Sequence, residues 1–116
     1  THTCGAIGDR LDLMVDTGID GIETLDPPPL GDTDLAEAKE KFGDRIFFKG
    51  DVHSVQVLLR GDEARVREKA RQTLEIGAAG GGFILSSACS VAPAVPPENL
   101  LAMVDECRRF SDERTG

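Results

Sequence analysis

The sequence predicts an α/β fold with a parallel sheet, and two observations support this prediction. Short apolar stretches alternate with amphipathic stretches along the 116 residues. The apolar stretches are bounded by Gly, Pro or Asp, as expected for strands buried in a parallel sheet. The chain has five Phe and neither Trp nor Tyr, so its core must be built mainly from aliphatic side chains. Its length fits a single domain, 1–116, or part of one.

Four strands are expected, at 1–4, 21–25, 45–50 and 82–87. With helices in the intervals, the order is β-α repeated four times, joined by right-handed crossovers. Four such units amount to half of a (β/α)8 TIM barrel, which typically needs about 250 residues. A small open α/β sheet is the alternative, because sequence alone cannot close the barrel.

The first three helical segments are expected at 6–18, 32–43 and 54–61. The first has an apolar face made of Ile7, Leu11, Met14 and Val15. It ends at Gly18, a residue type favoured just after a helix. The second begins on Asp32 or Thr33, both good N-caps, and stops at Gly43.

The last two helices are expected at 62–77 and 96–110. Asp62 is the N-cap of the first of them, whose buried stripe is Val66, Ala70 and Leu74. Pro97 suits the first turn of the other helix. The predicted stripe of that helix is Leu100, Met103, Val104 and Cys107.

Charge and composition exclude several classes of function. Thirteen basic and twenty-one acidic residues give a net charge of −8, which argues against nucleic-acid binding. No apolar run approaches the roughly 18 residues of a membrane helix, and no signal peptide is visible, so we expect a cytoplasmic protein. An odd count of three Cys favours free, metal-bound or reactive thiols. The chain starts without Met, which suggests a fragment or a processed product.

Three metal-binding side chains stand where strands end. His2 and Cys4 point to the same face of an extended segment, and Cys89 follows the last strand. Loops at the carboxyl ends of parallel strands gather on one face, so we expect the three to meet. One imidazole and two thiolates leave the fourth position of Zn²⁺ open, as in a catalytic site. The alternative is that the cysteines are packing residues, as we expect for Cys107.

A zinc centre of this kind favours a particular chemistry. Two thiolates and a neutral imidazole cancel the charge of the ion. Such a centre can bind a substrate thiol and lower its pKa, and the bound sulfur should keep much of its nucleophilicity. This suits alkylation of a thiol.

Other polar residues lie on the same predicted rim. Glu23 is a candidate pocket carboxylate or partner of His2, and Asp26 is a weaker candidate; capping and turn roles are the alternative, above all for Asp32. Asp51 and His53 are candidate catalytic groups, although His53 could equally be a partly exposed loop histidine or lie at the N-terminus of the short helix. The run "GAAGGG" (77–82) precedes a strand, so we expect a structural turn and no phosphate site.

The residues resemble a known family. The stretches "HTCG", "GIDGIETLDPPPLGDTDLAEAKEKFGDRIFFKGDV" and "GGGFILSSACSVAPAVPPENLLAMVDE" are similar to the C-terminal half of the uroporphyrinogen decarboxylase family. The similarity is greatest to its zinc-containing, corrinoid-dependent methyltransferases, whose zinc motif corresponds to His2, Cys4 and Cys89.

The resemblance implies a (β/α)8 barrel of which about the four C-terminal β/α units are present. It also implies transfer of a methyl group from a methylated corrinoid, supplied by a partner protein, to a thiol or tetrahydrofolate-type acceptor. Decarboxylase members of the family use neither metal nor cofactor, so a tetrapyrrole decarboxylase is the alternative. A non-catalytic fragment is a third hypothesis. Half a barrel exposes sheet edges, so we expect a homodimer or pairing with an N-terminal half.

Overall fold

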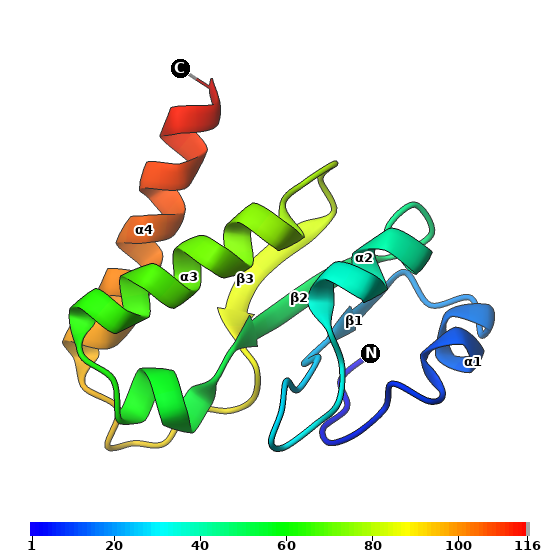
Figure 1. Cartoon of the computed structure of the whole chain (residues 1–116), viewed down its shortest axis with the longest axis horizontal. Helices are drawn as coiled ribbons and strands as arrows, with labels where there is room; N and C mark the ends of the chain where they lie inside the picture. The colour runs from blue at the N-terminus through cyan, green and yellow to red at the C-terminus, as the bar shows by residue number, and fades with distance from the viewer. Residues whose placement is uncertain (116) are drawn as a thin grey trace.

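The computed structural model describes residues 1–115. The elements follow in the order α1 (Leu11–Asp16), β1 (Gly21–Glu23), α2 (Leu35–Phe42), β2 (Phe47–Val52), the π-helical turn η1 (Ser54–Leu59), α3 (Glu63–Gly77), β3 (Phe83–Ser87) and α4 (Pro97–Thr115). The alternation of strands and helices matches the prediction (Figure 1).

The sheet is parallel throughout, as predicted. Its strands lie in chain order, with β1 beside β2 and β2 beside β3. The segment predicted as a strand at 1–4 is reduced to a single parallel bridge between His2 and Glu23. Two hydrogen bonds support that bridge, because the Glu23 amide donates to the Thr1 carbonyl and the N-terminal amine donates to Gly21. The start of the chain therefore extends the sheet beyond β1.

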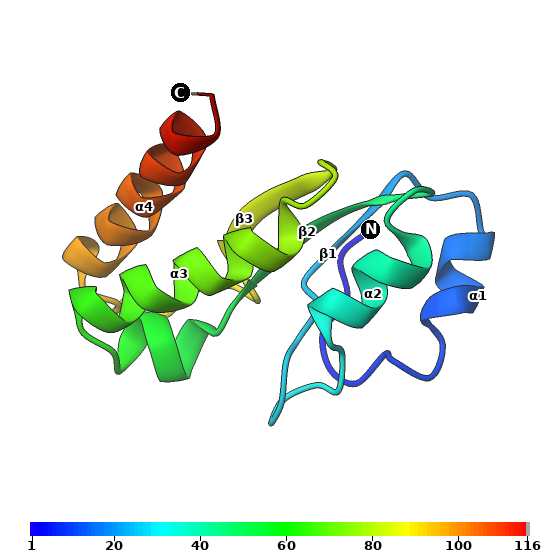
Figure 2. The ribbon, with the colours of Figure 1, turned by 45° about the horizontal axis from the view of Figure 1, so that its top comes forward.

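The two faces of the sheet differ in burial. Ile22 and Phe48 are fully buried on the face covered by helices, where α2 and α3 lie on the same side of the strands (Figures 1 and 2). The ladder aligns Glu23 with Lys49 and Lys49 with Ile84 on the other face. Glu23 and Lys49 are partly exposed and Ile84 is 49% exposed. Because His2 bridges to Glu23, the N-terminal imidazole belongs to this second, open face.

Two apolar clusters form the core. One joins α1 and α2 to the sheet through residues such as Leu11, Leu35 and Phe48. The other joins η1, α3 and α4 to the end of β2 through Leu58 and Val66. Aliphatic side chains make up both clusters apart from a few phenylalanines, in keeping with the composition.

The stripe predicted for α4 is confirmed in part, because Leu100 and Met103 are partly buried and pack against the second cluster. Val104 is 43% exposed and Cys107 is only partly buried. The helix instead buries Asn99, Ala102 and Glu106. Two of these are polar, and each has partners on other elements. The Asn99 amide donates to the carbonyl of Leu58 in η1 and to that of Gly61 just after η1. Glu106 faces two arginines of α3.

Helix ends follow the expected chemistry, with two corrections at helix starts. The helix predicted over 6–18 begins only at Leu11. Asp62 caps α3 by accepting from the Arg65 amide, and Gly18 has the positive φ of 86° typical of a residue after a helix. The cap of α2 is Asp34 and not Asp32 or Thr33, so that helix begins later than predicted. Asp32 instead accepts a hydrogen bond from the Gly8 amide, which ties the loop before α1 to the loop before α2.

Within residues 1–115, every helix is too short or too polar to cross a bilayer.

Candidate metal centre

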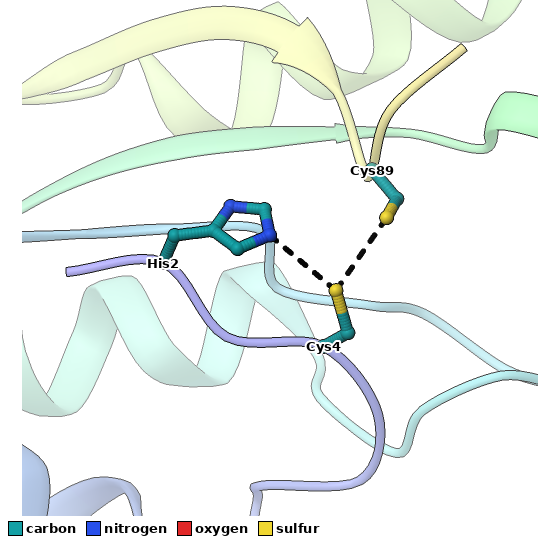
Figure 3. Close-up of side chains that lie close together, drawn as sticks. All are labelled: His2, Cys4 and Cys89. Atoms are coloured by element: carbon teal, nitrogen blue, oxygen red, sulfur yellow. Dashed lines mark hydrogen bonds between the residues drawn. The ribbon is translucent and has the colours of Figure 1, made fainter.

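His2, Cys4 and Cys89 meet at one end of the sheet (Figure 3). The ligand atoms lie within 4.8 Å of one another. The Cys4 Sγ is 3.4 Å from the His2 Nε2 and 3.5 Å from the Cys89 Sγ. The first two residues come from the start of the chain and the third from the loop after β3, which the parallel sheet brings to the same end.

These separations fit a tetrahedral metal ion. Zinc binds thiolates at about 2.3 Å and imidazole at about 2.0–2.1 Å, so two ligands of one tetrahedral ion lie about 3.6–3.8 Å apart. Both distances that involve Cys4 are close to this value. Two soft sulfur donors and one imidazole are also a ligand set that zinc prefers.

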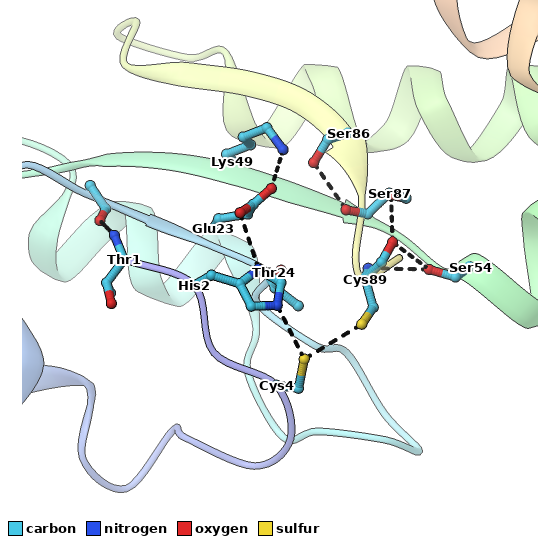
Figure 4. A network of polar contacts seen from close by, with 11 residues as sticks. Thr1, His2, Cys4, Glu23, Thr24, Lys49, Ser54, Ser86, Ser87 and Cys89 are labelled. Carbon is cyan, nitrogen blue, oxygen red and sulfur yellow. Dashed lines mark hydrogen bonds and ion pairs between the residues drawn. The ribbon is translucent and has the colours of Figure 1, made fainter. Parts of the chain in front are cut away.

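The His2 ring is oriented by β1 (Figure 4). Its Nδ1 lies 3.1 Å from a Glu23 carboxylate oxygen and 3.0 Å from the Thr24 hydroxyl. An ionised carboxylate can only accept, so Nδ1 carries the proton and Nε2 keeps its lone pair directed toward Cys4. Glu23 in turn forms an ion pair with Lys49, and this contact, followed by that with His2, holds the pKa of Glu23 below its usual range.

The Cys4 loop is held by Asp26. Asp26 is 2% exposed, and its Oδ2 accepts a hydrogen bond of 2.7 Å from the Gly5 amide. Gly5 has a φ of +88°, a conformation that favours glycine, so the chain can turn immediately after Cys4. The other carboxylate oxygen of Asp26 has no hydrogen-bond partner within residues 1–115.

The backbone of Cys89 is held by two serines. The last link of the β2–β3 pairing runs from the Ala88 amide to the Val52 carbonyl at 2.7 Å. At the next residue the Ser54 hydroxyl accepts from the Cys89 amide and donates to the Cys89 carbonyl, each at 3.1 Å. The Ser87 hydroxyl donates to the same carbonyl at 2.6 Å.

The surroundings of the two thiols oppose the ionisation of Cys4. The pKa of Cys4 is raised, first by its hydrogen bond with Cys89, then by desolvation and by the charges of Cys89 and Asp26. Two thiolates and a nearby carboxylate repel one another, and a divalent cation would remove that repulsion. Metal binding at this position would therefore release protons.

The group of three ligand atoms includes neither Asp51 nor His53, the other candidate catalytic residues. Asp51 lines a surface hollow of about 380 Å³ together with α3 residues such as Lys69 and Gln72. Burial raises the pKa of Asp51 to about 6, and the Asp34 and Asp26 carboxylates act in the same direction. The catalytic role of Asp51 stays a prediction.

His53 is the N-cap of η1, one of the structural roles that the sequence left open for it. Its Nδ1 accepts from the amides of Val55 and Gln56 at 3.2 Å and 3.1 Å. The proton of the neutral ring therefore sits on Nε2, which is buried and has no hydrogen-bond partner in the described part of the chain. A further catalytic role for His53 also stays a prediction.

Thr24 and Ser54 touch the cluster but were not singled out in the sequence. Thr24 has a φ of 70°, an unusual conformation for a β-branched residue. No sequence pattern predicts this conformation. Ser54 had a weak signal, because it follows the "GDVH" segment on the rim where β2 ends.

The sequence matches a known protein family over nearly its whole length. A family model described as uroporphyrinogen decarboxylase (URO-D) matches residues 1–110. The parallel sheet with a polar rim is an architecture common among α/β enzymes, and within that class the chain belongs to the uroporphyrinogen decarboxylase family.

Individual relatives fall into two groups of enzymes. The chain is 34% identical over 103 residues to "Methylcobamide:CoM methyltransferase MtaA" of Methanosarcina barkeri, covering 89% of this chain and 28% of the relative. It is 30% identical over 104 residues to the uroporphyrinogen decarboxylase of Methylococcus capsulatus, covering 90% and 28%. A solved methyltransferase from Methanosarcina mazei superposes with a TM-score of 0.77 at 29% identity, covering 95% of this chain and 30% of that chain. The chain thus spans less than a third of the length of these relatives.

Proposed function

We propose that residues 1–116 are the C-terminal half of a (β/α)8 barrel that acts as a zinc-dependent methyltransferase. The methyl group would come from a methylated corrinoid on a partner protein and pass to a thiol or tetrahydrofolate-type acceptor. The observation that carries the proposal is the convergence of the His2, Cys4 and Cys89 ligand atoms within 4.8 Å. The similarity to a methylcobamide:CoM methyltransferase supports the choice of reaction.

The barrel itself is part of the proposal. Strands in chain order, all parallel, are what consecutive β/α units of a barrel would give. The share of the relatives' length that the chain covers supports a missing portion, which would pair with the open face and free edge of the sheet. A second copy of this chain could cover the same surface.

The chain's own residues would divide the work at the metal. His2 would bind through Nε2 while its Nδ1 proton stays with Glu23, and Cys4 and Cys89 would bind as thiolates. When bound, Zn²⁺ would lower the pKa of an acceptor thiol so that a thiolate is available near pH 7. Lys49 would keep Glu23 ionised and so preserve the tautomer of His2.

A metal-free decarboxylase is the second candidate, because proteins with that activity match the chain at similar identity. The two candidates differ in what they require of the cysteines. Decarboxylation without a cofactor would make no use of paired thiols, whereas the methyltransferase needs both.

Zinc titration of the reduced chain under anaerobic conditions tests the proposal. We expect one zinc per chain, and we expect Cys89→Ser to weaken zinc binding by at least tenfold because a thiolate ligand is lost. Cys107→Ser is the matched control and should bind zinc as the unaltered chain does, since Cys107 lies on α4. Absence of zinc binding, or equal affinity of the Cys89 variant, would contradict the proposal. Tetrapyrrole decarboxylation that survives the Cys89 change, in the chain paired with its N-terminal half, would favour the second candidate.

A further inference from the structure

We infer that Ser54, assisted by Ser87, is a positioning residue for Cys89 and sets the affinity of the metal site. This inference rests on the proposed function, because it assumes that Cys89 is a metal ligand. It concerns two hydroxyl groups that bind the backbone of Cys89 and do not touch its sulfur (Figure 4).

The first step is that Ser54 forms hydrogen bonds with both backbone groups of Cys89. A hydroxyl has one proton to donate and lone pairs to accept with. Ser54 uses both, donating to the Cys89 carbonyl and accepting from the Cys89 amide. A neighbouring strand would supply the same two hydrogen bonds, one to the amide and one to the carbonyl. They follow directly after the last backbone hydrogen bond between β2 and the end of β3, which joins Ala88 to Val52. Ser54 thus fixes the backbone of a residue that lies outside the strands.

The second step is that Ser54 is itself fixed. It is 7% exposed and begins η1, whose first amides are capped by the imidazole of His53. A buried hydroxyl on a capped helical turn has little freedom to move. The Ser87 hydroxyl adds a second donor to the Cys89 carbonyl, from the end of β3. The Cys89 backbone is therefore anchored from both sides of the loop.

The third step links the backbone of Cys89 to the metal. The Cys89 Sγ already lies 3.5 Å from the Cys4 Sγ, close to the separation of two ligands on one ion. Without the hydroxyls, the loop would gain conformations in which this sulfur points elsewhere, and binding would have to select against them. Loss of groups that orient a metal ligand typically weakens metal binding about 10-fold to 100-fold.

The test is an anaerobic Co²⁺ titration of the 116-residue chain, followed by competition with Zn²⁺. Absorption from sulfur-to-cobalt charge transfer reports thiolate coordination without any assay of activity. We expect Ser54→Ala to weaken zinc binding about 10-fold to 100-fold. We expect Ser54→Thr, which keeps the hydroxyl, to restore most of the affinity. Ser90→Ala is the matched control, because Ser90 is exposed and also adjoins Cys89.

Each outcome has one meaning. If the unaltered chain binds neither ion, the proposed function fails. If the unaltered chain binds and Ser54→Ala binds equally well, the positioning role alone is overturned. A purely structural role would lower the melting temperature of the metal-free variant and leave affinity and charge-transfer intensity unchanged. If Ser54→Ala does not fold, Ser87→Ala decides: about threefold or greater weakening supports the inference, and unchanged affinity overturns it.

Discussion

At the residue scale, Glu23 shows how a single carboxylate can fix the chemistry of a neighbour. It contacts His2 on one side and Lys49 on the other, and the three side chains come from three adjacent segments of the sheet. The ion pair with Lys49 keeps the Glu23 carboxylate ionised, and the ionised carboxylate keeps the proton on the Nδ1 of His2.

Glu23→Gln should therefore weaken zinc binding about tenfold. The amide preserves the size of the side chain but no longer attracts the His2 proton as a charge, so the ligand nitrogen loses basicity. Competition with a chromogenic chelator measures the affinity. Glu37→Gln is the control, since that carboxylate pairs with Lys41 on the surface of α2. Equal affinities for the Glu23 and Glu37 variants would contradict this reading of the site.

Asp51 predicts a dependence of stability on pH. Burial raises its pKa from 3.8 to about 6 in the folded chain, so the folded state binds the proton more tightly than the unfolded state. Stability from this group therefore falls as pH rises between those two values and stays lower above them.

Asp51→Asn should then stabilise the chain at pH 7, by at most about 3 kcal/mol for a shift of about two units. The gain should shrink as the pH falls toward about 3, below the ordinary pKa of 3.8, because Asp51 is then mostly protonated in both states. Urea unfolding at both pH values, with the exposed Asp44→Asn as control, measures the effect. A gain that is equal at the two pH values would exclude ionisation as its cause.

At the element scale, α4 is attached through polar groups as much as through apolar ones. The Asn99 amide donates to the carbonyls of Leu58 and Gly61 at 2.8 Å and 2.9 Å. About two turns further along the helix, the buried Glu106 faces Arg67 and Arg71 of α3. These contacts set the rotation of α4 about its axis.

Asn99→Ala should lower the free energy of unfolding by about 1–3 kcal/mol, because two carbonyls lose their donor at a position that is 2% exposed. Urea denaturation with chelator present would measure the loss apart from any metal effect. Asp112→Ala, at an exposed position of the same helix, should change stability little. Alanine favours helices more than Asn or Asp does, so helix propensity cannot cause a loss. An Asn99 variant that is no less stable than the Asp112 variant would contradict the role of the buried amide.

This helix also marks the limit of prediction from sequence. The α3 stripe of Val66, Ala70 and Leu74 was predicted correctly because apolar spacing alone determines it. The α4 stripe was predicted only in part, since Leu100 and Met103 do pack against the core. Burial of Asn99 and Glu106 was missed because it depends on acceptors and arginines of other elements, about which apolar spacing says nothing.

The same distinction applies to the candidate metal centre. The meeting of His2, Cys4 and Cys89 followed from strand alternation and from the shared rim of parallel strands. The supporting contacts did not follow. Thr24 reaches His2 through an unusual backbone conformation, and Ser54 reaches Cys89 through the exact place where β2 gives way to η1.

At the scale of the whole molecule, zinc should stabilise the chain. A ligand that binds only the folded state adds about 2.7 kcal/mol at a concentration of 100 times its dissociation constant. Thermal unfolding with zinc, compared with magnesium as the control, should give a higher melting temperature that chelator reverses. The increase should be lost in Cys89→Ser. An unchanged melting temperature at saturating zinc would contradict metal binding by the folded state.

The span of the site along the chain has a kinetic consequence. Cys4 and Cys89 are 85 residues apart, with all the named strands between them. In the proposed site, their sulfurs would reach the native geometry for sharing an ion once β1, β2 and β3 have assembled side by side, since each strand adds one step to the path across the sheet. Tight capture of an ion should therefore come late in refolding, and its rate should report when the last strand arrives.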